Sequence, residues 1–145
     1  TFDTVARDPR GHAISVTYMG LGKDITPVGS STTQHPQFFP ITDLPKLAYD
    51  HQEIITYAHQ RIQAKITYTN AIYALLDPHF TMSQLQTAYE AVFCRPLDKR
   101  NFRKKFLSLN LIQATSEMFQ DGAHRPARLY KFNTVGLETL SRSFD

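Results

Sequence analysis

The stretch LDKRNFRKKF, at residues 97–106, combines positive charge and aromatic rings on one short segment. Six of the eleven residues from Arg95 to Lys105 are basic, and only Asp98 is acidic. Lysine and arginine neutralise phosphates and release counterions, while arginine and asparagine can also read base edges in the DNA major groove. The segment therefore predicts contact with nucleic acid. The alternative left open is a solvated basic helix face that binds nothing.

Helical spacing separates the rings from the charge. At the 100° per residue that follows from 3.6 residues per turn, Phe102, Phe106 and Leu109 converge on one face of a helix that begins near residue 99. The face pointing broadly away carries Arg100, Arg103, Lys104, Leu107 and Ser108. We therefore expect the aromatic residues to anchor the helix to a core, with the charge directed outward.

Nine residues form the predicted DNA-binding surface. On the helix we assign the base-reading face to Arg100, Asn101, Arg103 and Lys104. Lys99 and Lys105 flank the buried stripe, and we expect them to meet phosphate or only solvent. Beyond the helix, the tip of a predicted hairpin adds His124, Arg125 and Arg128.

The elements that must position this surface begin with a helix near residue 82. Thr81 can cap that helix while Gln84 returns the bond, which is a capping box, and Phe80 and Leu85 then form a hydrophobic staple. The predicted buried face consists of Leu85, Ala88, Tyr89 and Val92.

A short turn then leads into the basic helix. Asp98 is the predicted N-cap of this second helix, with Leu97 and Phe102 as a second staple. Residues 111–133 predict two strands joined by a loop around 121–126. Helix, turn, basic helix and hairpin together predict a winged helix-turn-helix.

The N-terminal half predicts a strand and a long helix. Residues 12–21 alternate and are rich in β-branched residues, which indicates a strand. Its shared apolar face would carry Ile14, Val16 and Tyr18. From the expected N-cap Asp50 to Ile66, apolar residues recur at helical spacing. A shorter helix is expected over residues 70–76.

Charge divides the chain in the same way as these patterns. Residues 1–63 hold five basic against six acidic side chains, whereas residues 64–145 hold eleven against seven. The net charge of +3 therefore belongs to the second half. We expect two domains, at residues 1–66 and 67–145, and an anionic partner for the second.

Composition excludes several classes of site. No apolar run approaches the 18 residues of a membrane span. Cys94 is the single cysteine, so no intrachain disulfide and no cysteine-based metal site is possible, which fits a reducing cytoplasm. We expect Cys94 to be a buried thiol. The six histidines show no tight ligand spacing, so neither a metal site nor a catalytic residue is predicted.

These residues resemble a known family. FTMSQLQTAYEAVFCRPLDKRNFRKKFLSLNLIQAT, followed by RPARLYKF, closely resembles the C-terminal winged-helix domain of the Nudix-related bacterial transcriptional regulators of NAD metabolism. TFDTVARDPRGHAISVTYMGL is similar to the strand region after the Nudix helix in these regulators and in ADP-ribose pyrophosphatases. FFPITDLPKLAYDHQEII resembles the later strand and last helix of that domain.

The resemblance implies a fold and a function. The fold would be α/β (α+β), with a partial Nudix-like mixed sheet and helix in residues 1–66 and the winged helix-turn-helix in residues 67–145. The protein would be a dimeric repressor that binds double-stranded operator DNA upstream of NAD biosynthesis or salvage genes. ADP-ribose or a related NAD derivative would release the DNA. Arg7, Asp8 and Arg10 could lie near the diphosphate of this effector, and the alternative is a charged loop before a strand.

One departure from the family pattern concerns catalysis. The Nudix box, G-x5-E-x7-R-E-x-x-E-E-x-G, is absent, and its glutamates hold the metals that activate water in Nudix enzymes. The chain resembles the family from just after that helix, and it begins with Thr1. We therefore do not expect hydrolysis by this chain. Two alternatives stay open: an ADP-ribose pyrophosphatase whose box lies outside the given chain, and a protein-interaction module.

Overall fold

The computed structural model describes residues 1–5, 7–30, 35–120 and 125–144. The chain divides into two compact units, Thr1–Gln60 and Arg61–Asp145. Helix α1 (His51–Tyr68) begins in the first unit and ends in the second. The predicted domain boundary after residue 66 stays a prediction.

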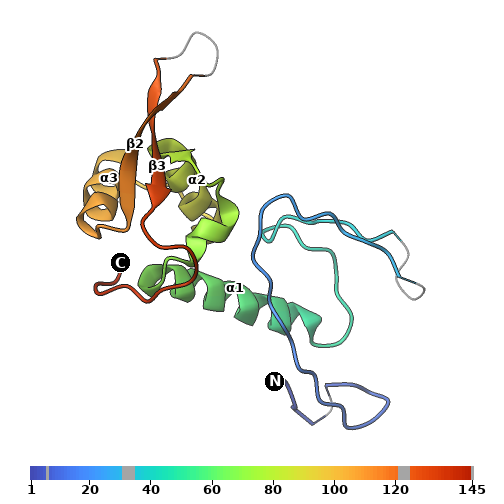
Figure 1. Cartoon of the computed structure of the whole chain (residues 1–145). Coiled ribbons are helices and arrows are strands. Elements are labelled where there is room, and N and C mark those ends of the chain that lie inside the picture. Colours follow the sequence, from blue (N-terminus) through green and yellow to red (C-terminus); the bar gives the residue numbers. More distant parts are fainter. Residues whose placement is uncertain (6, 31–34, 121–124, 145) are drawn as a thin grey trace. The chain divides into compact units, whose positions relative to one another are not determined.

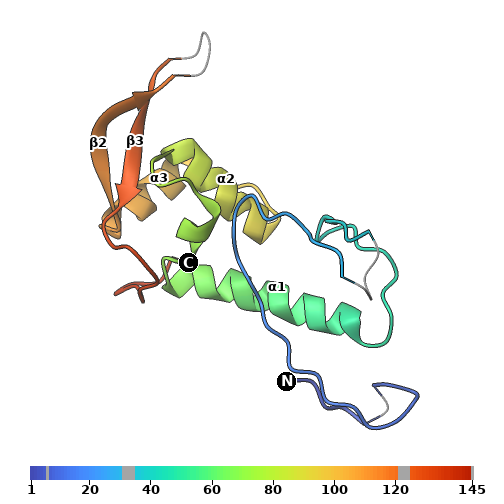
Figure 2. The same ribbon diagram turned by 45° about the vertical axis from the view of Figure 1, so that its right-hand side comes forward.

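The second unit is built from helices and one small antiparallel sheet. After α1 its elements are η1 (Ala71–Leu75), β1 (Phe80–Thr81), α2 (Met82–Phe93), α3 (Lys99–Ser108), β2 (Ile112–Phe119) and β3 (Ala127–Phe132). The strand order is β1-β3-β2. The β2–β3 hairpin projects beyond α2 and α3 (Figures 1 and 2). This arrangement confirms the predicted α+β class and the winged helix-turn-helix.

Both predicted helix caps are present. The Thr81 side chain accepts a hydrogen bond from the Gln84 N–H at 3.2 Å, and the Gln84 side chain accepts one from the Thr81 N–H at 2.7 Å. At the start of α3, the Asp98 carboxylate accepts the Asn101 N–H at 2.8 Å. Each cap satisfies N–H groups that a helix start leaves without a partner, so the two starts are defined locally by sequence.

An aromatic cluster forms the centre of the second unit. Tyr89 of α2 packs against Phe102 and Phe106 of α3, with ring centroids 5.5 and 5.7 Å apart. The Phe144 ring packs at a tilt against Tyr89, with centroids 4.7 Å apart, and completes the cluster. The Tyr89 hydroxyl donates to the Ile66 carbonyl at 3.3 Å, and burial raises the pKa of this phenol. The predicted buried faces of α2 and α3 are thereby confirmed.

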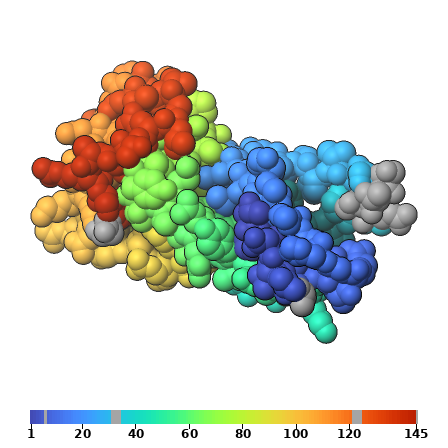
Figure 3. Space-filling view, turned by 90° about the horizontal axis from the view of Figure 1, so that it is seen from below, coloured from blue at the N-terminus to red at the C-terminus, as the bar shows by residue number. Residues whose placement is uncertain are grey.

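A C-terminal strap, residues 133–144, ties the end of α1 to this core. The buried Asn70 amide donates to the Gly136 carbonyl at 2.9 Å and accepts the Glu138 N–H at 2.8 Å. The Phe144 N–H donates to the Thr67 carbonyl at 2.6 Å. In Figure 3 the strap, in red, lies over the green segment that ends α1. The strap thus connects the end of α1 to the aromatic cluster of the second unit.

The first unit differs from the expected partial mixed sheet. Across its described residues, the pairing consists of one antiparallel bridge, between Phe2 and Ser15, so the strand predicted at 12–21 is wrong. A strand needs a neighbour along its length to bond its N–H and C=O groups, and here one bridge is all that forms. The apolar side chains of that segment are exposed, with Ile14 at 64% and Tyr18 at 91%.

The structure also bears on two predicted helices and on Cys94. The helix predicted from Asp50 to Ile66 is confirmed as α1. The helix expected at 70–76 is a five-residue 3-10 helix, η1. Cys94 is exposed, so the predicted buried thiol is wrong. Cys94 ends α2 in the left-handed conformation, with φ at 51°, and this turn carries the side chain off the buried stripe.

Candidate nucleic-acid interface

Helix α3 presents its positive charge to solvent because its aromatic residues face the core. Phe102 and Phe106 are buried, whereas Arg100, Arg103 and Lys104 are exposed. None of these three cations is paired with a carboxylate within the part of the chain that the structure describes. An ammonium or guanidinium that is not in an internal ion pair is available for an external anion.

A groove runs between the start of α2, one flank of α3 and the hairpin. Its lining residues are Thr81, Met82, Ser83, Gln86, Lys99, Arg103, Met118, Arg125, Pro126, Ala127, Arg128 and Tyr130. Four of these are cations, contributed by α3 and by the wing, and no carboxylate belongs to this set of described residues. Concentrated positive charge of this kind favours a polyanion.

Two further features of the groove favour phosphate. The first turn of α2 lies in its wall, and the N–H groups of a helix start carry partial positive charge that attracts anions. The guanidinium of Arg103 donates a long hydrogen bond of 3.4 Å to the hydroxyl of the buried Tyr130. That bond turns Arg103 toward the wing, where it meets Arg125 and Arg128 in the same groove.

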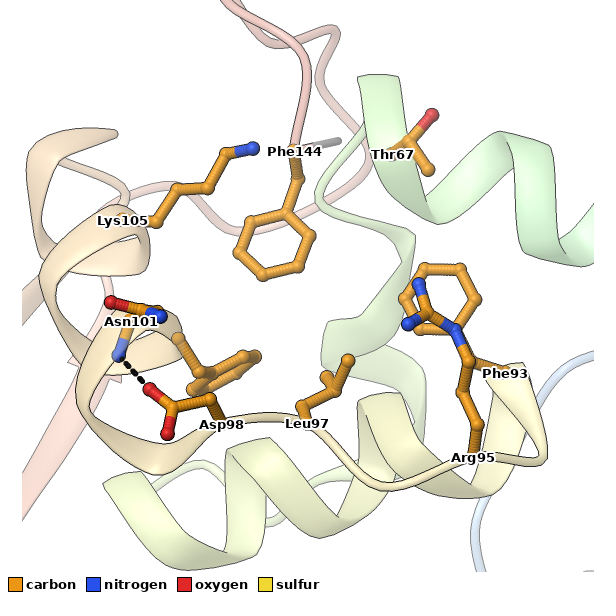
Figure 4. A pocket seen from close by; sticks show the side chains of 9 residues that line it. Thr67, Phe93, Arg95, Leu97, Asp98, Asn101, Lys105 and Phe144 are labelled. Carbon is orange, nitrogen blue, oxygen red and sulfur yellow. Dashed lines mark hydrogen bonds between the residues drawn. The ribbon is translucent and has the colours of Figure 1, made fainter.

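The structure separates the predicted residues of α3 into three rows. Lys99 and Arg103 line the groove beside the wing. Arg100 and Lys104 lie opposite the buried rings, at the exposed centre of the helix. The third row lines a different hollow, on the far flank, and consists of Asn101 and Lys105 (Figure 4). His124 lies outside the described residues, so its predicted role stays a prediction.

A hydrogen-bonded network fixes the turn that sets the angle between α2 and α3. The Glu90 carboxylate accepts the Leu97 N–H at 2.8 Å and the Gln86 amide at 2.9 Å. The same Gln86 amide donates to the Leu97 carbonyl at 2.9 Å. Both hydrogen bonds lower the pKa of the Glu90 carboxyl, and the bond from the Leu97 N–H has the larger effect. This turn places the basic helix relative to the rest of the unit.

The residues proposed for the effector lie in ion pairs of the first unit. Arg7 binds the Asp50 carboxylate through two hydrogen bonds, of 2.7 and 2.8 Å. Arg10 binds Asp8 at 2.7 and 3.0 Å, and its guanidinium lies over the Tyr49 ring at 5.3 Å. The Arg10 side chain and N–H lower the pKa of Asp8 to about 2. Both arginines are therefore held by carboxylates in this structure.

Sequence reasoning missed several residues of the interface. Thr81, Ser83 and Gln86 line the cationic groove although they carry no charge, and Arg95 lines the far hollow. The capping box was the available signal for the first three residues, because it marks the start of α2, which lies in the wall of the groove. No comparable signal indicated Arg95, since its position depends on the left-handed turn at Cys94.

Two other kinds of site are absent from the described ranges. No helix there is long and apolar enough to cross a membrane. Likewise, no group of three histidine, cysteine, aspartate or glutamate side chains lies close enough together to hold a metal ion.

Comparison with protein families gives a match within the second unit. Residues 72–132 match the family described as the NrtR DNA-binding winged helix domain. The matched segment begins in η1 and ends with β3, so it contains the whole sheet, α2 and α3.

Two curated proteins are similar to longer or different parts of the chain. The "ADPR responsive transcriptional repressor NtrR" of Acinetobacter baylyi is 30% identical over 129 residues, covering 87% of this chain and 51% of that protein. The "ADP-ribose pyrophosphatase" of Methanocaldococcus jannaschii is 39% identical over 51 residues, covering 34% of this chain and 29% of that protein. The chain thus spans about half the length of the first relative.

Two solved structures share the fold. The crystal structure of Shewanella oneidensis NrtR complexed with a 27mer DNA aligns with a TM-score of 0.72 at 22% identity. The crystal structure of Shewanella oneidensis NrtR aligns with a TM-score of 0.71 at 26% identity. Each alignment covers 99% of this chain and 67% of the NrtR chain.

Proposed function

Because residues 72–132 match the NrtR DNA-binding winged helix domain, we propose that this protein is a transcriptional repressor that binds double-stranded operator DNA. Its targets would be genes of NAD biosynthesis or salvage, and it would act in the cytoplasm. ADP-ribose or a related NAD derivative would weaken the binding. The relative from Acinetobacter baylyi, an ADPR responsive transcriptional repressor, supports both parts of this proposal.

The observation that carries the proposal is the cationic groove. Lys99 and Arg103 of α3 face Arg125 and Arg128 of the wing across the start of α2. A DNA strand passing through this groove would place its phosphates against four cations and a helix N-terminus. The adjacent Arg100 and Lys104 would then point into the major groove, where arginine and lysine bind guanine O6 and N7.

The direct test is fluorescence anisotropy of the 145-residue protein on promoter fragments of NAD-metabolism genes, with random DNA for comparison, over a salt series. We expect the protein to prefer the promoter. The logarithm of its affinity should fall linearly with the logarithm of the salt concentration, with a slope of about −0.9 for each phosphate that is neutralised. Arg100→Ala and Arg103→Ala should weaken specific binding by about tenfold or more, whereas Lys65→Ala on α1 should change it little. Equal effects of all three substitutions would remove α3 from the interface.

The effector and the oligomeric state form a further part of the proposal. ADP-ribose added to the complex should lower the anisotropy, through a site in the first unit that includes Arg7, Asp8 and Arg10. We also propose a homodimer, because two copies of α3 could then read a two-fold symmetric operator. Sedimentation of the protein on a palindromic fragment should give two protein chains per duplex, and one chain per duplex would contradict the dimer.

A second candidate function follows from the relative in Methanocaldococcus jannaschii, an ADP-ribose pyrophosphatase. Under this hypothesis the protein would hydrolyse ADP-ribose, with catalytic glutamates supplied from outside the given sequence. Release of AMP from ADP-ribose in the presence of magnesium would support it. The intact mass of the natural protein, measured beside this assay, would show whether additional chain accompanies the activity.

A further inference from the structure

The flank of α3 that faces away from the wing carries a second set of cations. Arg95, Asn101 and Lys105 line one hollow there, together with Phe144 of the strap (Figure 4). Arg95 and Lys105 come from different elements, the inter-helix turn and α3. No carboxylate pairs with either cation within the described part of the chain. The hollow therefore holds two positive charges that take part in no ion pair of the described residues.

Ring contacts hold both cations in place. The Lys105 ammonium lies 5.6 Å from the centre of the Phe144 ring, and the Arg95 guanidinium lies 5.4 Å from the centre of the Phe93 ring. Such cation–π contacts restrain long side chains without removing their charge. The one carboxylate of the hollow, on Asp98, already accepts the Asn101 N–H at 2.8 Å. Two restrained cations thus outweigh one acidic group.

The volume of the hollow limits the size of the anion that it can bind. Its volume of about 270 Å³ is below the roughly 300–1,000 Å³ typical of small-molecule sites. The rings that form its floor are themselves buried, with Phe102 exposed by 4% and Phe144 by 7%. Two cations lie at its edge, the exposed Arg95 and the half-buried Lys105. A space of this size between two cations suits a single phosphate group of a polyanion better than a whole small-molecule ligand.

The geometry of a helix in DNA supplies the phosphate. A helix with side chains is about 10–12 Å wide, and the major groove is about 12 Å wide, so a helix lying in the groove has a sugar–phosphate backbone along each flank. On α3, Lys99 and Arg103 occupy the flank beside the wing. Asn101 and Lys105 occupy the opposite flank. The two backbones bordering one major groove would therefore meet different flanks.

We infer that Arg95 and Lys105 bind the DNA backbone that borders the major groove on the side away from the wing. This inference rests on the proposed DNA-binding function and extends it to a residue outside α3 and the wing. Cations on both flanks of α3 would then hold the helix between the two DNA backbones. Phosphate contacts of this kind fix the register and orientation of the helix but carry no base preference.

The test compares substitutions on the two flanks in the full chain. Arg95→Ala and Lys105→Ala should each reduce the slope of log affinity against log salt by about one, and should weaken binding about eightfold at 0.1 M salt. The loss should be equal on promoter and random DNA. Arg95→Lys and Lys105→Arg, which keep the charge, should restore the slope. Arg61→Ala and Lys65→Ala on α1 serve as matched controls and should leave the slope unchanged.

The outcomes separate this inference from the proposed function. Unchanged affinity and slope in Arg95→Ala and Lys105→Ala, with weakened binding in Arg103→Ala, would overturn the inference alone. A loss that appears only on the promoter would also overturn it, because base recognition would then explain the effect. Absence of DNA binding by the unsubstituted chain would overturn the proposed function and the inference together.

Discussion

The Glu90 carboxylate accepts a hydrogen bond from the backbone N–H of Leu97 at 2.8 Å, across the turn between α2 and α3. The two residues are seven positions apart along the chain. The bond closes the turn from the last part of α2 to the residue before the α3 cap. The same carboxylate also holds Gln86, whose amide bonds the Leu97 carbonyl. One side chain therefore holds the turn that leads into the basic helix.

Removing this carboxylate should loosen the turn. In Glu90→Ala the Leu97 N–H loses its acceptor and Gln86 loses one partner, so we expect the midpoint of thermal unfolding to fall by roughly a few degrees. DNA affinity should fall as well, because α3 is no longer held at one angle. Circular dichroism and anisotropy would measure the two effects. Glu53→Ala, an exposed site on α1, is the control, and equal stability of the two variants would contradict the role of Glu90.

The charge on Glu90 should also make stability depend on pH. Its pKa is lowered in the folded state, chiefly by the Leu97 N–H, so the carboxylate stabilises the fold fully above its unfolded pKa of about 4.3. This contribution disappears as the pH falls through the lower folded pKa. The free energies of unfolding of the parent and Glu90→Gln should therefore differ most near neutral pH and converge in acid. A difference that stays constant from pH 7 to pH 3 would disprove the linkage.

Asp98 should have opposite effects on folding and on DNA binding. Its carboxylate caps α3, but its negative charge lies beside the cations of the far hollow. Asparagine caps a helix about as well as aspartate, so Asp98→Asn should change stability by less than about 0.5 kcal/mol. DNA affinity should rise by about threefold to tenfold at low salt, since a repulsive charge is removed.

Two comparisons make the Asp98 prediction specific. Asp98→Ala removes the cap together with the charge, and should cost about 1 kcal/mol of stability. The gain in affinity of Asp98→Asn should shrink as salt is raised, because it is electrostatic. Weaker, sequence-dependent binding by Asp98→Asn would show instead that the carboxylate reads a cytosine amino group.

The parts of the fold that sequence predicted well are those determined by neighbouring residues. Thr81 and Gln84 define the start of α2 through bonds that span three positions. Phe102 and Phe106 define the buried face of α3 in the same local way. Caps and helical periodicity need no information about distant contacts, so sequence alone was sufficient for the helix-turn-helix.

The predictions from sequence were wrong where contacts between distant residues determine the structure. The alternation at residues 12–21 predicts a strand, but a strand exists only with a neighbour, and a single bridge from Phe2 to Ser15 is present. For Cys94, apolar periodicity predicted burial, whereas the left-handed turn at the end of α2 exposes the side chain. Within the interface, Asn101 and Arg103 are two positions apart, yet they line different hollows. Helical spacing alone separates the two side chains by about 200°, but the hollow that each one lines is completed by the strap for Asn101 and by the wing for Arg103.

The strap should contribute measurably to the stability of the second unit through Asn70. This amide is 1% exposed, and it satisfies both the Gly136 carbonyl and the Glu138 N–H. Asn70→Ala would leave two backbone groups of the strap without their partner, which should cost about 2 kcal/mol in the free energy of unfolding. Urea denaturation would measure this change.

A matched asparagine supplies the control for this prediction. The exposed Asn133 amide also donates to a backbone carbonyl, that of Asn110, at 2.6 Å. Water can replace the bond there, so Asn133→Ala should cost less than about 1 kcal/mol. If both substitutions cost the same, burial of Asn70 would not explain its effect. Because the strap also carries Phe144 into the cluster behind α3, Asn70→Ala should weaken DNA binding more than Asn133→Ala. Equal DNA affinities would show that α3 keeps its position without the strap.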